Sequence, residues 1–417
     1  MATIRSTSKT GQVVTLVGTT GADYFFGGSG KDTFVGNGGA DYFKAGYGSA
    51  TVDYSWAPSG ITVNLSKDFA QQTGGGGLNT LIGITGIIGT RYDDNIWGNY
   101  HNDILKGNGG NDTINGSDGN DQIEGGDGND TLGGGNGEDS LFGGTGADVL
   151  RGERDGDLLD GGSGDDLIFG GGLNDRLYGG YGNDTLAGGQ GIDIVDGGDG
   201  FDIALFSDAL KGVTIDRRDT SGRSNTNDAG GDVFVHIEAY QLTYYSDRFI
   251  AYGETVTVWG MEGDDDLTGS GGADKLYGGV GNDRLNGGGH NDILDGGDGN
   301  DILDGGYEAY DIFYGGKGND TFVFTPGSSQ SRYPDEIMDW NKGDKIDLSR
   351  MDPVPGGADN ALIFTSGGSV TAAAQVGFQR VDFDTLRVFA DTNGDKIADF
   401  FLLVHTSGTL TASDFVL

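Results

Sequence analysis

Apolar side chains recur at every ninth position from Ile96 to Ala204, and most residues between them are glycine, asparagine or aspartate. The 117 residues from Gly89 to Leu205 divide into thirteen nine-residue units without insertion or deletion. Each unit approximates G-G-x-G-x-D-x-U-x, in which U is a large apolar residue. A period this regular predicts a repeat architecture, in which each unit adds the same small element to a stack.

Each unit predicts one tight turn and one short strand. Glycine at positions 1, 2 and 4 permits positive φ, so the first six residues are suited to a turn. The remaining x-U-x suits a very short strand whose eighth position points inward, because side chains alternate along a strand. Two units, or eighteen residues, then form one coil of an all-β parallel β-roll with two turn-lined edges. The predicted inward residues are Ile96, Leu105, Ile114, Ile123, Leu132, Leu141, Leu150, Leu159, Ile168, Leu177, Leu186, Val195 and Ala204.

An aspartate occupies the sixth position of every one of these units. A coil of eighteen residues sorts these aspartates into two rows, one along each edge of the roll. The first row holds Asp94, Asp112, Asp130, Asp148, Asp166, Asp184 and Asp202. The second row holds Asp103, Asp121, Asp139, Asp157, Asp175 and Asp193.

Rows of stacked carboxylates require a cation. Neighbours about 4.8 Å apart repel by roughly 1 kcal/mol in water and by roughly 3 to 4 kcal/mol at an effective dielectric constant near 20. The chain has no cysteine and only four histidines, so the available ligands are carboxylate and backbone carbonyl oxygens. Several hard oxygen ligands converging on flexible turns favour Ca²⁺ over zinc or magnesium.

The nonapeptide units resemble those of the repeats-in-toxin (RTX, haemolysin-type) calcium-binding β-roll family. The unit from Gly125 to Gly133, with the sequence Gly-Gly-Asp-Gly-Asn-Asp-Thr-Leu-Gly, carries the full pattern. The resemblance implies that Ca²⁺ lies between successive turns on each edge, held by the sixth-position aspartate and by turn carbonyls. It therefore implies that the thirteen aspartates above are metal ligands.

Two further blocks of units flank the main run. The first block supplies the candidate ligands Asp23, Asp32 and Asp41, and its pattern decays at Ala50. The last block has one extra residue in its sixth unit, which predicts a bulge in the strand ladder and a weaker site beside it. Its candidate ligands are Asp265, Asp274, Asp283, Asp292, Asp301, Asp311 and Asp320.

Two segments that interrupt the units look like diverged copies of each other. Ser55 to Gly60 followed by Ile-Thr-Val matches Ser207 to Gly212 followed by Val-Thr-Ile, which indicates a duplication of insert plus roll. In the first copy the alternating stretch 61–65 predicts a strand and residues 74–77 a loop. The predicted organisation is a lead-in and first block at 1–53, a β insert at 54–88, the main roll at 89–205, a second β insert with degenerate units at 206–259, a third block at 260–323 and a cap and secretion domain at 324–417.

Residues 324–417 resemble the carboxy-terminal domain of serralysin-type secreted proteases. Asp335 to Trp340, Gly343 to Ser349 and the ending Asp414-Phe415-Val416-Leu417 carry this resemblance. It implies a β domain that caps the roll and holds an uncleaved signal for type I secretion. Within it, a D-x-N-x-D-x-x-x-D spacing predicts one more Ca²⁺ site, although a plain acidic turn is the alternative. Its candidate ligands are Asp391, Asn393, Asp395 and Asp399.

Composition and charge narrow the partners and the compartment. The formal charge of −39 argues against nucleic acid and against an anionic membrane surface. No run approaches eighteen apolar residues, so no transmembrane segment is predicted, and residues 1–20 lack the apolar core of a secretory signal peptide. Calcium sites of moderate affinity stay empty in the cytosol and fill outside the cell. The RTX resemblance therefore implies export of the unfolded chain by the type I apparatus and a secreted, extracellular location.

The sequence offers no catalytic motif. It contains neither the H-E-x-x-H of zinc proteases nor the G-x-S-x-G of lipases. The aromatic residues of the second insert predict a small core in preference to a sugar-stacking platform. The sequence thus predicts a secreted, non-catalytic calcium-binding protein with an extracellular binding or structural role. The alternatives are an accessory module of a polysaccharide-modifying enzyme of the alginate epimerase or lyase type, and a surface-layer or adhesion protein.

Overall fold

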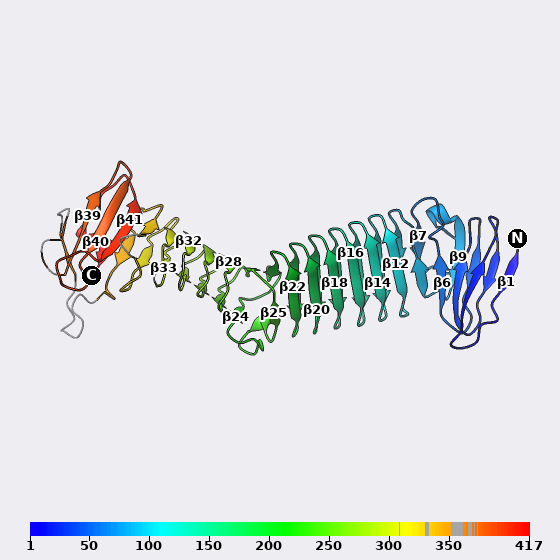
Figure 1. Ribbon diagram of the computed structural model, residues 1–417. Coiled ribbons are helices and arrows are strands. Elements are labelled where there is room, and N and C mark those ends of the chain that lie inside the picture. The colour runs from blue at the N-terminus through cyan, green and yellow to red at the C-terminus, as the bar shows by residue number, and fades with distance from the viewer. Residues whose placement is uncertain (308, 330–332, 352–361, 366–368, 371, 373) are drawn as a thin grey trace. The chain divides into compact units, whose positions relative to one another are not determined.

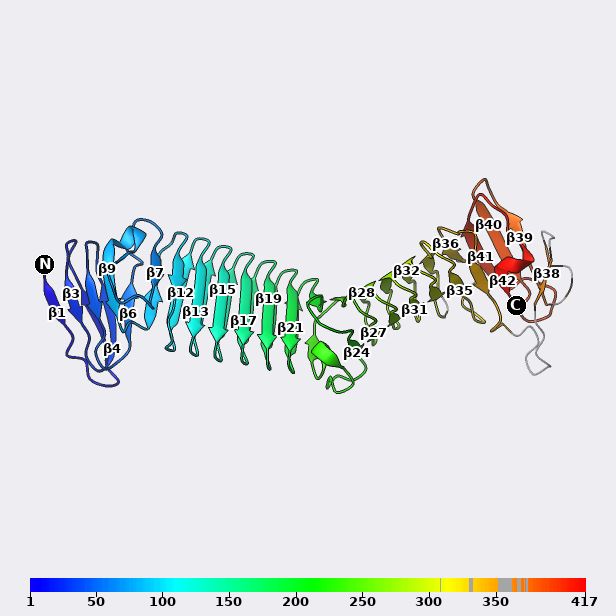
Figure 2. The same ribbon diagram turned by 180° about the vertical axis from the view of Figure 1, so that it is seen from behind.

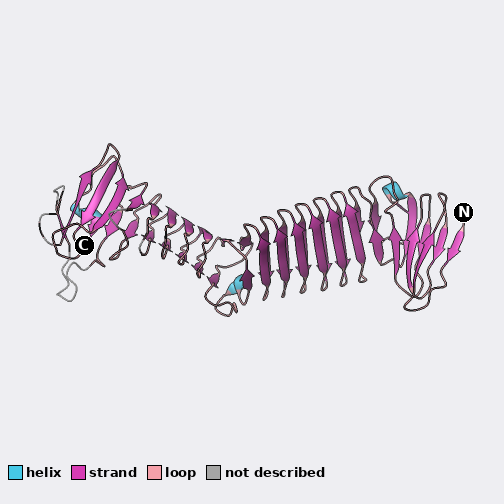
Figure 3. Ribbon diagram, viewed as in Figure 1, coloured by secondary structure: helices cyan, strands magenta, loops and turns pink. Residues whose placement is uncertain are grey.

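The computed structural model describes residues 1–307, 309–329, 333–351, 362–365, 369–370, 372 and 374–417, and almost all regular structure in them is β-strand (Figure 3). The helical elements of these residues are three single 3-10 turns, η1 (Gly74–Gly76), η2 (Asn227–Ala229) and η3 (Ala412–Asp414). None of these is long or apolar enough to cross a membrane. The chain forms two compact units, one of residues 1–205 and 232–237 and the other of residues 206–231 and 238–417. The all-β class is confirmed.

Two parallel sheets form the roll of the first unit, and the chain alternates between them from one strand to the next (Figures 1 and 2). One sheet contains β2 (Val13–Val17), β4 (Lys31–Val35), β6 (Ala50–Asp53), β10 (Gly86–Ile88), β12 (Ile104–Gly109), β14 (Gln122–Asp127), β16 (Ser140–Thr145), β18 (Leu158–Ser163), β20 (Arg176–Tyr181), β22 (Ile194–Asp199) and β25 (Val233–Val235). The other contains β7 (Thr62–Asn64), β11 (Asn95–Trp97), β13 (Thr113–Asp118), β15 (Thr131–Asn136), β17 (Val149–Arg154), β19 (Leu167–Gly172), β21 (Thr185–Gln190) and β23 (Ile203–Leu205). Paired residues in the main roll are eighteen apart, as predicted.

The strands of the main roll are longer than the predicted x-U-x. In β12 and β14 the pairing covers Ile104 to Lys106, skips Gly107 at position 1 and resumes at Asn108 and Gly109. Positions 2 and 3 therefore belong to the ladder, and only positions 4 to 6 form the turn. The reason is that glycine at position 1 lets the backbone change direction without leaving the neighbouring coil.

A single row of apolar side chains from each sheet fills the space between the two sheets. Each of the thirteen predicted inward residues has at most 1% of its surface exposed. Each coil therefore buries two large apolar side chains, because glycine occupies most of the adjoining positions. At the amino-terminal end Phe25, Phe34 and Phe43 replace the aliphatic residues, and their rings pack with centroids 4.9 to 5.9 Å apart.

A smaller sheet faces the amino-terminal strands β2, β4 and β6 across the core, where its Phe25 and Phe43 pack on Phe34. Its strands, in spatial order, are β1 (Thr3–Arg5), β3 (Tyr24–Phe26), β5 (Tyr42–Lys44), β9 (Leu78–Ile82) and β8 (Gln71–Gln72). The strand predicted at 61–65 is confirmed as β7, which pairs with β11 and places the first insert directly on the roll. The predicted loop at 74–77 contains the turn η1.

The second unit repeats the two-sheet arrangement. One sheet contains β24 (Thr214–Asp216), β27 (Arg248–Ile250), β29 (Asp266–Thr268), β31 (Arg284–Asn286), β33 (Ile302–Asp304), β35 (Thr321–Val323), β37 (Lys345–Asp347) and β42 (Phe415–Val416). The parallel strands of the other are β26 (Ala239–Gln241), β28 (Thr257–Glu262), β30 (Lys275–Val280), β32 (Ile293–Asp298), β34 (Ile312–Tyr314) and β36 (Asp335–Ile337).

The extra residue of the last block does not bulge the ladder. Strands β32 and β34 pair from Ile293 opposite Ile312 to Asp295 opposite Tyr314 without interruption. The register changes from eighteen to nineteen residues between the pair Gly289–Tyr307 and the pair Ile293–Ile312. The prediction of a bulge within these strands is therefore wrong.

The carboxy-terminal residues close the roll of the second unit. Strands β39 (Gln375–Arg380), β40 (Thr385–Ala390) and β41 (Phe400–His405) form an antiparallel sheet, and β38 (Ile363–Phe364) pairs with β39. Strand β41 also pairs in parallel with β36, and β42 pairs with β37. The last strands of both roll sheets are thus covered, as the predicted cap requires.

Candidate metal centre

The sixth-position aspartates of the main roll stack in two rows along its edges. In eleven of the thirteen units the backbone N–H of the aspartate donates to Oδ1 of the aspartate one coil further on, as Asp94 does to Asp112 at 2.7 Å and Asp103 to Asp121 at 2.7 Å. The carboxylates from Asp112 to Asp202 are therefore held in one orientation by the preceding coil. All thirteen are at most 3% exposed.

The second oxygen of most of these carboxylates has no donor. We term a turn open when Oδ2 of its aspartate is buried and accepts no hydrogen bond from the described part of the chain. The aspartates of the open turns are Asp41, Asp112, Asp121, Asp130, Asp139, Asp148, Asp157, Asp166, Asp175, Asp184, Asp193, Asp265, Asp283, Asp292, Asp301, Asp311 and Asp320. A buried charged oxygen without a partner is costly, so these seventeen atoms indicate positions for a cation.

Six other turns supply their own donor to Oδ2 of the aspartate, and we term them capped turns, although Oδ1 of Asp103 is buried without a hydrogen bond from the described residues. In each, the N–H of the residue at position 2 donates to Oδ2 of the aspartate at position 6, as Thr90 does to Asp94 at 2.6 Å. The hydroxyl of Thr90 also donates to this carboxylate. The aspartates of the capped turns are Asp23, Asp32, Asp94, Asp103, Asp247 and Asp274.

The backbone conformation at position 2 separates the two kinds of turn. In every open turn this residue has positive φ, including the non-glycine residues Asn37, Asn108, Ser117, Glu153 and Met261 at 62° to 83°. The position-2 residues of the six capped turns are absent from the positive-φ residues of the described chain. Positive φ costs a non-glycine residue about 1 kcal/mol or more, so the open conformation is imposed on these residues by their surroundings.

The neighbouring coil determines which kind of turn forms. In an open turn Oδ1 accepts from the N–H of another aspartate of the row, whereas in four of the capped turns the donor is the N–H of a residue that is not an aspartate. Ala2 donates to Asp23, Ile61 to Asp94, Val213 to Asp247 and Val256 to Asp274. Open turns thus stack on a coil that carries an aspartate on the same edge.

The donor set of an open turn is suited to a hard cation. A β-carbon built on Gly107 would collide with Oδ2 of Asp112 and with the carbonyl oxygen of Gly125 in the next coil. Glycine at position 1 therefore lets a carboxylate oxygen and a carbonyl oxygen of adjacent coils face the same space. In the described residues, no three or more His, Cys, Asp or Glu side chains lie close enough together to hold a metal ion by themselves. Backbone carbonyls must complete each site, which is typical of calcium.

Burial raises the pKa of the carboxyl groups in open turns, and the carboxylates of adjacent coils add to the effect. The pKa is about 8 for Asp112, Asp175, Asp265 and Asp292. It is about 6 to 7 for Asp41, Asp121, Asp130, Asp139, Asp157, Asp166, Asp193, Asp283, Asp301, Asp311 and Asp320. In the capped turns burial likewise raises the pKa of Asp94, Asp247 and Asp274, and that of Asp103 to about 7, whereas the hydrogen bond from the Thr19 N–H lowers the pKa of Asp23.

Three aspartates extend the rows beyond the nonapeptide units and were not predicted. Oδ1 of Asp232 accepts from the Asp193 N–H, that of Asp335 from Asp311 and that of Asp344 from Asp320. Oδ2 of Asp335 is buried without a hydrogen bond in the described residues, and burial raises its pKa to about 8. These residues follow their neighbours by 24 or 39 positions, so a search with a period of eighteen passes over them.

Position 5 forms an outer ladder that the sequence analysis also missed. Side-chain oxygens at this position accept the N–H of position 5 in the next coil, as Asn111 does from Asn129 at 2.9 Å and Asn129 from Ala147 at 3.0 Å. The frequent Asn-Asp pair at positions 5 and 6 was the available signal. The N–H at position 5 donates to the preceding coil, as Asn129 does to Asn111, and the N–H at position 6 donates to the following coil, as Asp130 does to Asp148. Each such turn is therefore bonded to both of its neighbours.

The predicted carboxy-terminal site has a different character. The two oxygens of Asp391 accept the N–H groups of Gly394 at 2.7 Å and Lys396 at 3.0 Å, and Oδ1 of Asp399 accepts from Thr392. Asn393 and Asp395 likewise accept from backbone N–H groups within the loop. These bonds shape the turn, and its binding of Ca²⁺ stays a prediction.

The repeat units of this chain are similar to those of known proteins. The family model described as RTX calcium-binding nonapeptide repeat (4 copies) matches residues 15–43, 87–114, 97–132, 106–141, 133–168, 142–177, 169–204, 244–276, 259–293, 277–306, 286–322 and 306–328. Among solved structures, the AlgE6R3 subunit of the Azotobacter vinelandii mannuronan C5-epimerase is similar at 22% identity and a TM-score of 0.23, over 41% of this chain and 78% of that one. A search of curated proteins gave no match.

Position 2 can be tested at Asn108, whose φ of 76° opens the turn of Asp112. We expect Asn108→Thr to return this turn to the capped conformation, because a β-branched residue disfavours positive φ. The variant should bind one calcium ion fewer per chain by native mass spectrometry. Asn108→Gly is the matched control, since both changes remove the hydrogen bond that the Asn108 side-chain amide donates to the Gly89 carbonyl oxygen. Equal ion counts in the two variants would contradict the assignment.

The raised pKa values predict opposite effects of acid with and without metal. Since the folded-state pKa values of about 6 to 8 exceed those of unfolded aspartate, the contribution of these groups to stability is complete below about pH 4 and lost as pH rises through 6 to 8. The chelated chain should therefore be most ordered in mild acid. Calcium must displace these protons when it binds. The Ca²⁺ concentration at which half of the chain is folded should therefore rise by up to about tenfold for each unit that the pH falls below 8. Circular dichroism titrations between pH 5 and 8 measure both effects, and a constant midpoint would refute the competition.

Proposed function

The chain belongs to the family of RTX calcium-binding nonapeptide repeat proteins, whose model matches more than half of it, and from this premise we propose a secreted protein that folds on calcium. Outside the cell the folded rolls serve a non-catalytic binding or structural role. The observation that carries this proposal is the set of seventeen buried Oδ2 atoms without a hydrogen-bond donor in the described residues. A divalent ion in each open turn would supply the missing partner.

Charge supports the coupling of folding to calcium. The formal charge of −39 is concentrated in stacked carboxylates, which repel one another when ionised. Two positive charges in each of seventeen turns would offset most of this charge. Each coil buries only two large apolar side chains, so the apolar core alone offers little to oppose the repulsion. Ion binding therefore contributes directly to the free energy of folding.

The compartment follows from the concentration of calcium. Extracellular calcium modules bind with dissociation constants of roughly 10⁻⁴ to 10⁻³ M, which cytosolic calcium does not reach. A chain that stays unfolded until it meets calcium can be exported as an extended polypeptide. The similarity of residues 324–417 to serralysin-type domains supports a type I export signal in this region, which also closes the second roll.

Calcium titration tests the proposed folding. In chelator the full chain should give the circular dichroism spectrum of a largely disordered polypeptide, and millimolar Ca²⁺ should induce a β spectrum with a cooperative melt. The same concentration of Mg²⁺ is the control, because its octahedral preference and strong hydration suit these sites poorly. A full cooperative melt in chelator would exclude the proposal.

Export can be tested independently of folding. We expect deletion of the last fifty residues to abolish secretion from cells that carry a type I apparatus, measured as the protein in the medium. Deletion of residues 1–17 is the control, since the lead-in is proposed to hold no export signal. Secretion of the carboxy-terminal deletion at the level of the control would contradict this assignment.

A further inference from the structure

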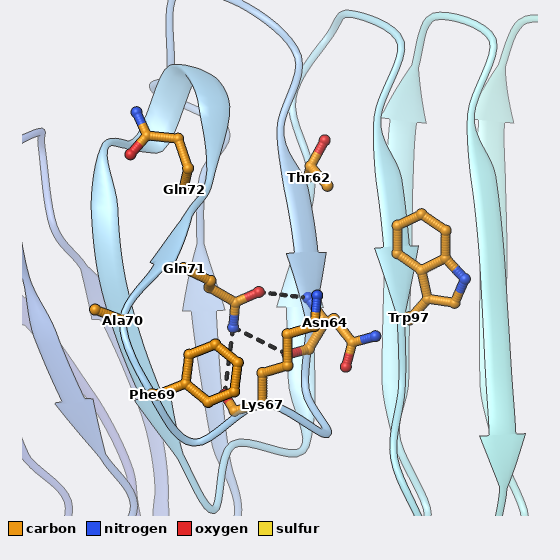
Figure 4. A pocket seen from close by; sticks show the side chains of 8 residues that line it. All are labelled: Thr62, Asn64, Lys67, Phe69, Ala70, Gln71, Gln72 and Trp97. Atoms are coloured by element: carbon orange, nitrogen blue, oxygen red, sulfur yellow. Dashed lines mark hydrogen bonds between the residues drawn. The ribbon is translucent and has the colours of Figure 1, made fainter.

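A pocket of about 500 Å³ lies on the outer surface of the first unit, between the first insert and the roll. Strand β7 and the loop after it form one side, and Trp97 at the end of β11 forms the other. Figure 4 shows Phe69 and Trp97 at opposite sides of the pocket, with the side chains of Lys67 and Asn64 between them. The thirteen regular units of the roll do not contain this loop, so the pocket is a feature of the insert.

One lining residue has an evident structural role. The amide of Gln71 accepts the N–H of Asn64 at 2.9 Å and donates to the carbonyl oxygen of Asn64 at 2.9 Å. This bidentate contact holds the loop against β7. A similar contact occurs in the second insert, where the side chain of Asn225 bonds the strand residue Asp216. There Oδ1 of Asn225 accepts the N–H of Asp216 at 2.8 Å.

Three other lining residues have no comparable structural role. The Phe69 ring is 62% exposed, although burial of a phenylalanine side chain would be favourable. Trp97 points outward from the roll and is half-buried. Lys67 is exposed and forms no ion pair with the described residues, in a chain with more than twice as many acidic as basic residues. A cation and two aromatic rings are thus gathered where the fold does not use them.

The second insert provides an internal comparison. Its strand β24 pairs with β27 as β7 pairs with β11, so Asp216 and Ile250 occupy the places of Asn64 and Trp97. Counting from the strand ends, Asp219 replaces Lys67 and Ser221 replaces Phe69. The carboxylate of Asp219 is bonded to Ser221 and Ser224 of its own loop. The same strand pairing therefore forms without the aromatic and cationic residues, which indicates that the first insert retains them for a ligand.

We propose that this pocket binds an anionic saccharide, an inference that specifies the extracellular binding role above and rests on it. The faces of Phe69 and Trp97 carry negative charge density and pack on the weakly positive C–H face of a sugar ring. The amides of Asn64 and Gln72 are donors and acceptors for ring hydroxyls. The Lys67 ammonium pairs with a carboxylate of the sugar. An aromatic-lined hollow with a few polar groups is the usual composition of a small-ligand site.

Calcium enters this recognition indirectly. The chain without ions carries a formal charge of −39, which repels an anionic ligand over distances comparable to the Debye length. Ions in the open turns reduce this repulsion, and they order the coil of Asp112, whose strand β13 pairs with the strand β11 that carries Trp97. The saccharide is therefore expected to bind only the calcium-loaded protein.

Isothermal titration calorimetry of the full chain in saturating calcium tests the site, with trigalacturonate as the anionic probe and maltotriose as the neutral one. We expect trigalacturonate to bind at least tenfold more tightly than maltotriose. Two variants copy the second insert. Trp97→Ile should weaken trigalacturonate binding at least tenfold, and Lys67→Asp should remove the preference for the anionic sugar. Tyr47→Ser is the matched control, since Tyr47 is a fully exposed aromatic residue outside the pocket and its loss should leave the affinity unchanged.

The outcomes separate this inference from the calcium proposal. A variant with the calcium-dependent β spectrum and melting temperature of the parent protein is folded, so its loss of binding reports on the pocket. If the folded parent protein binds neither sugar, or binds both equally, the anionic-saccharide assignment is wrong while the calcium proposal stands. Unchanged affinity in Trp97→Ile would also overturn it. If calcium fails to order the chain, the calcium proposal is the one that fails.

Discussion

A carboxylate whose two oxygens meet different surroundings is the constraint on which both rolls depend. In the open turns one oxygen of the aspartate accepts a backbone N–H from the neighbouring coil, which fixes the side chain in the turn. In the open turns the other oxygen is buried and accepts no hydrogen bond from the described residues. Burial raises the pKa of these groups, to about 8 at Asp112 and about 6 at Asp121, so near neutral pH each such turn must hold a proton, a metal ion or an uncompensated charge. The fold is electrostatically incomplete without one of the first two.

Position 2 decides how that requirement is met. With ordinary φ its N–H turns toward the aspartate of its own unit and completes the carboxylate, as at Thr90 and Thr243. With positive φ the N–H points elsewhere and the oxygen is left for a cation. Glycine suits the second conformation, whereas threonine and serine add a hydroxyl to the first. Glycine at position 2 therefore permits the open turn but does not impose it, since Gly28 occupies this position in the capped turn of Asp32.

The sequence predicted the features that depend on the nine-residue period and missed those that depend on backbone conformation. Ile96 to Ala204 lie in the core as expected, and the aspartates stack every eighteen residues, because alternation along a strand and the length of a coil follow from spacing alone. The period cannot distinguish Asp94 from Asp112, since both occupy position 6 of a recognisable unit. Their difference arises from the coil on which each turn stacks. Asp335 and Asp344 join the rows across longer loops, which no fixed period anticipates.

The placement of the capped turns follows from the same stacking rule. An ion between two coils can bridge carboxylates only if both coils carry an aspartate on that edge. Where the neighbouring coil instead presents Ile61, Val213 or Val256, an open carboxylate would lack the second acidic group, and the position-2 N–H takes its place. In the main roll the rows therefore begin with Asp94 and Asp103, whose Oδ2 atoms accept a hydrogen bond within their own turn, next to the first insert. The inserts are thus compatible with the rolls because self-capped turns separate them from the first coils that require an ion, and this leaves the insert loops free to diverge in sequence, as Lys67 and Asp219 have.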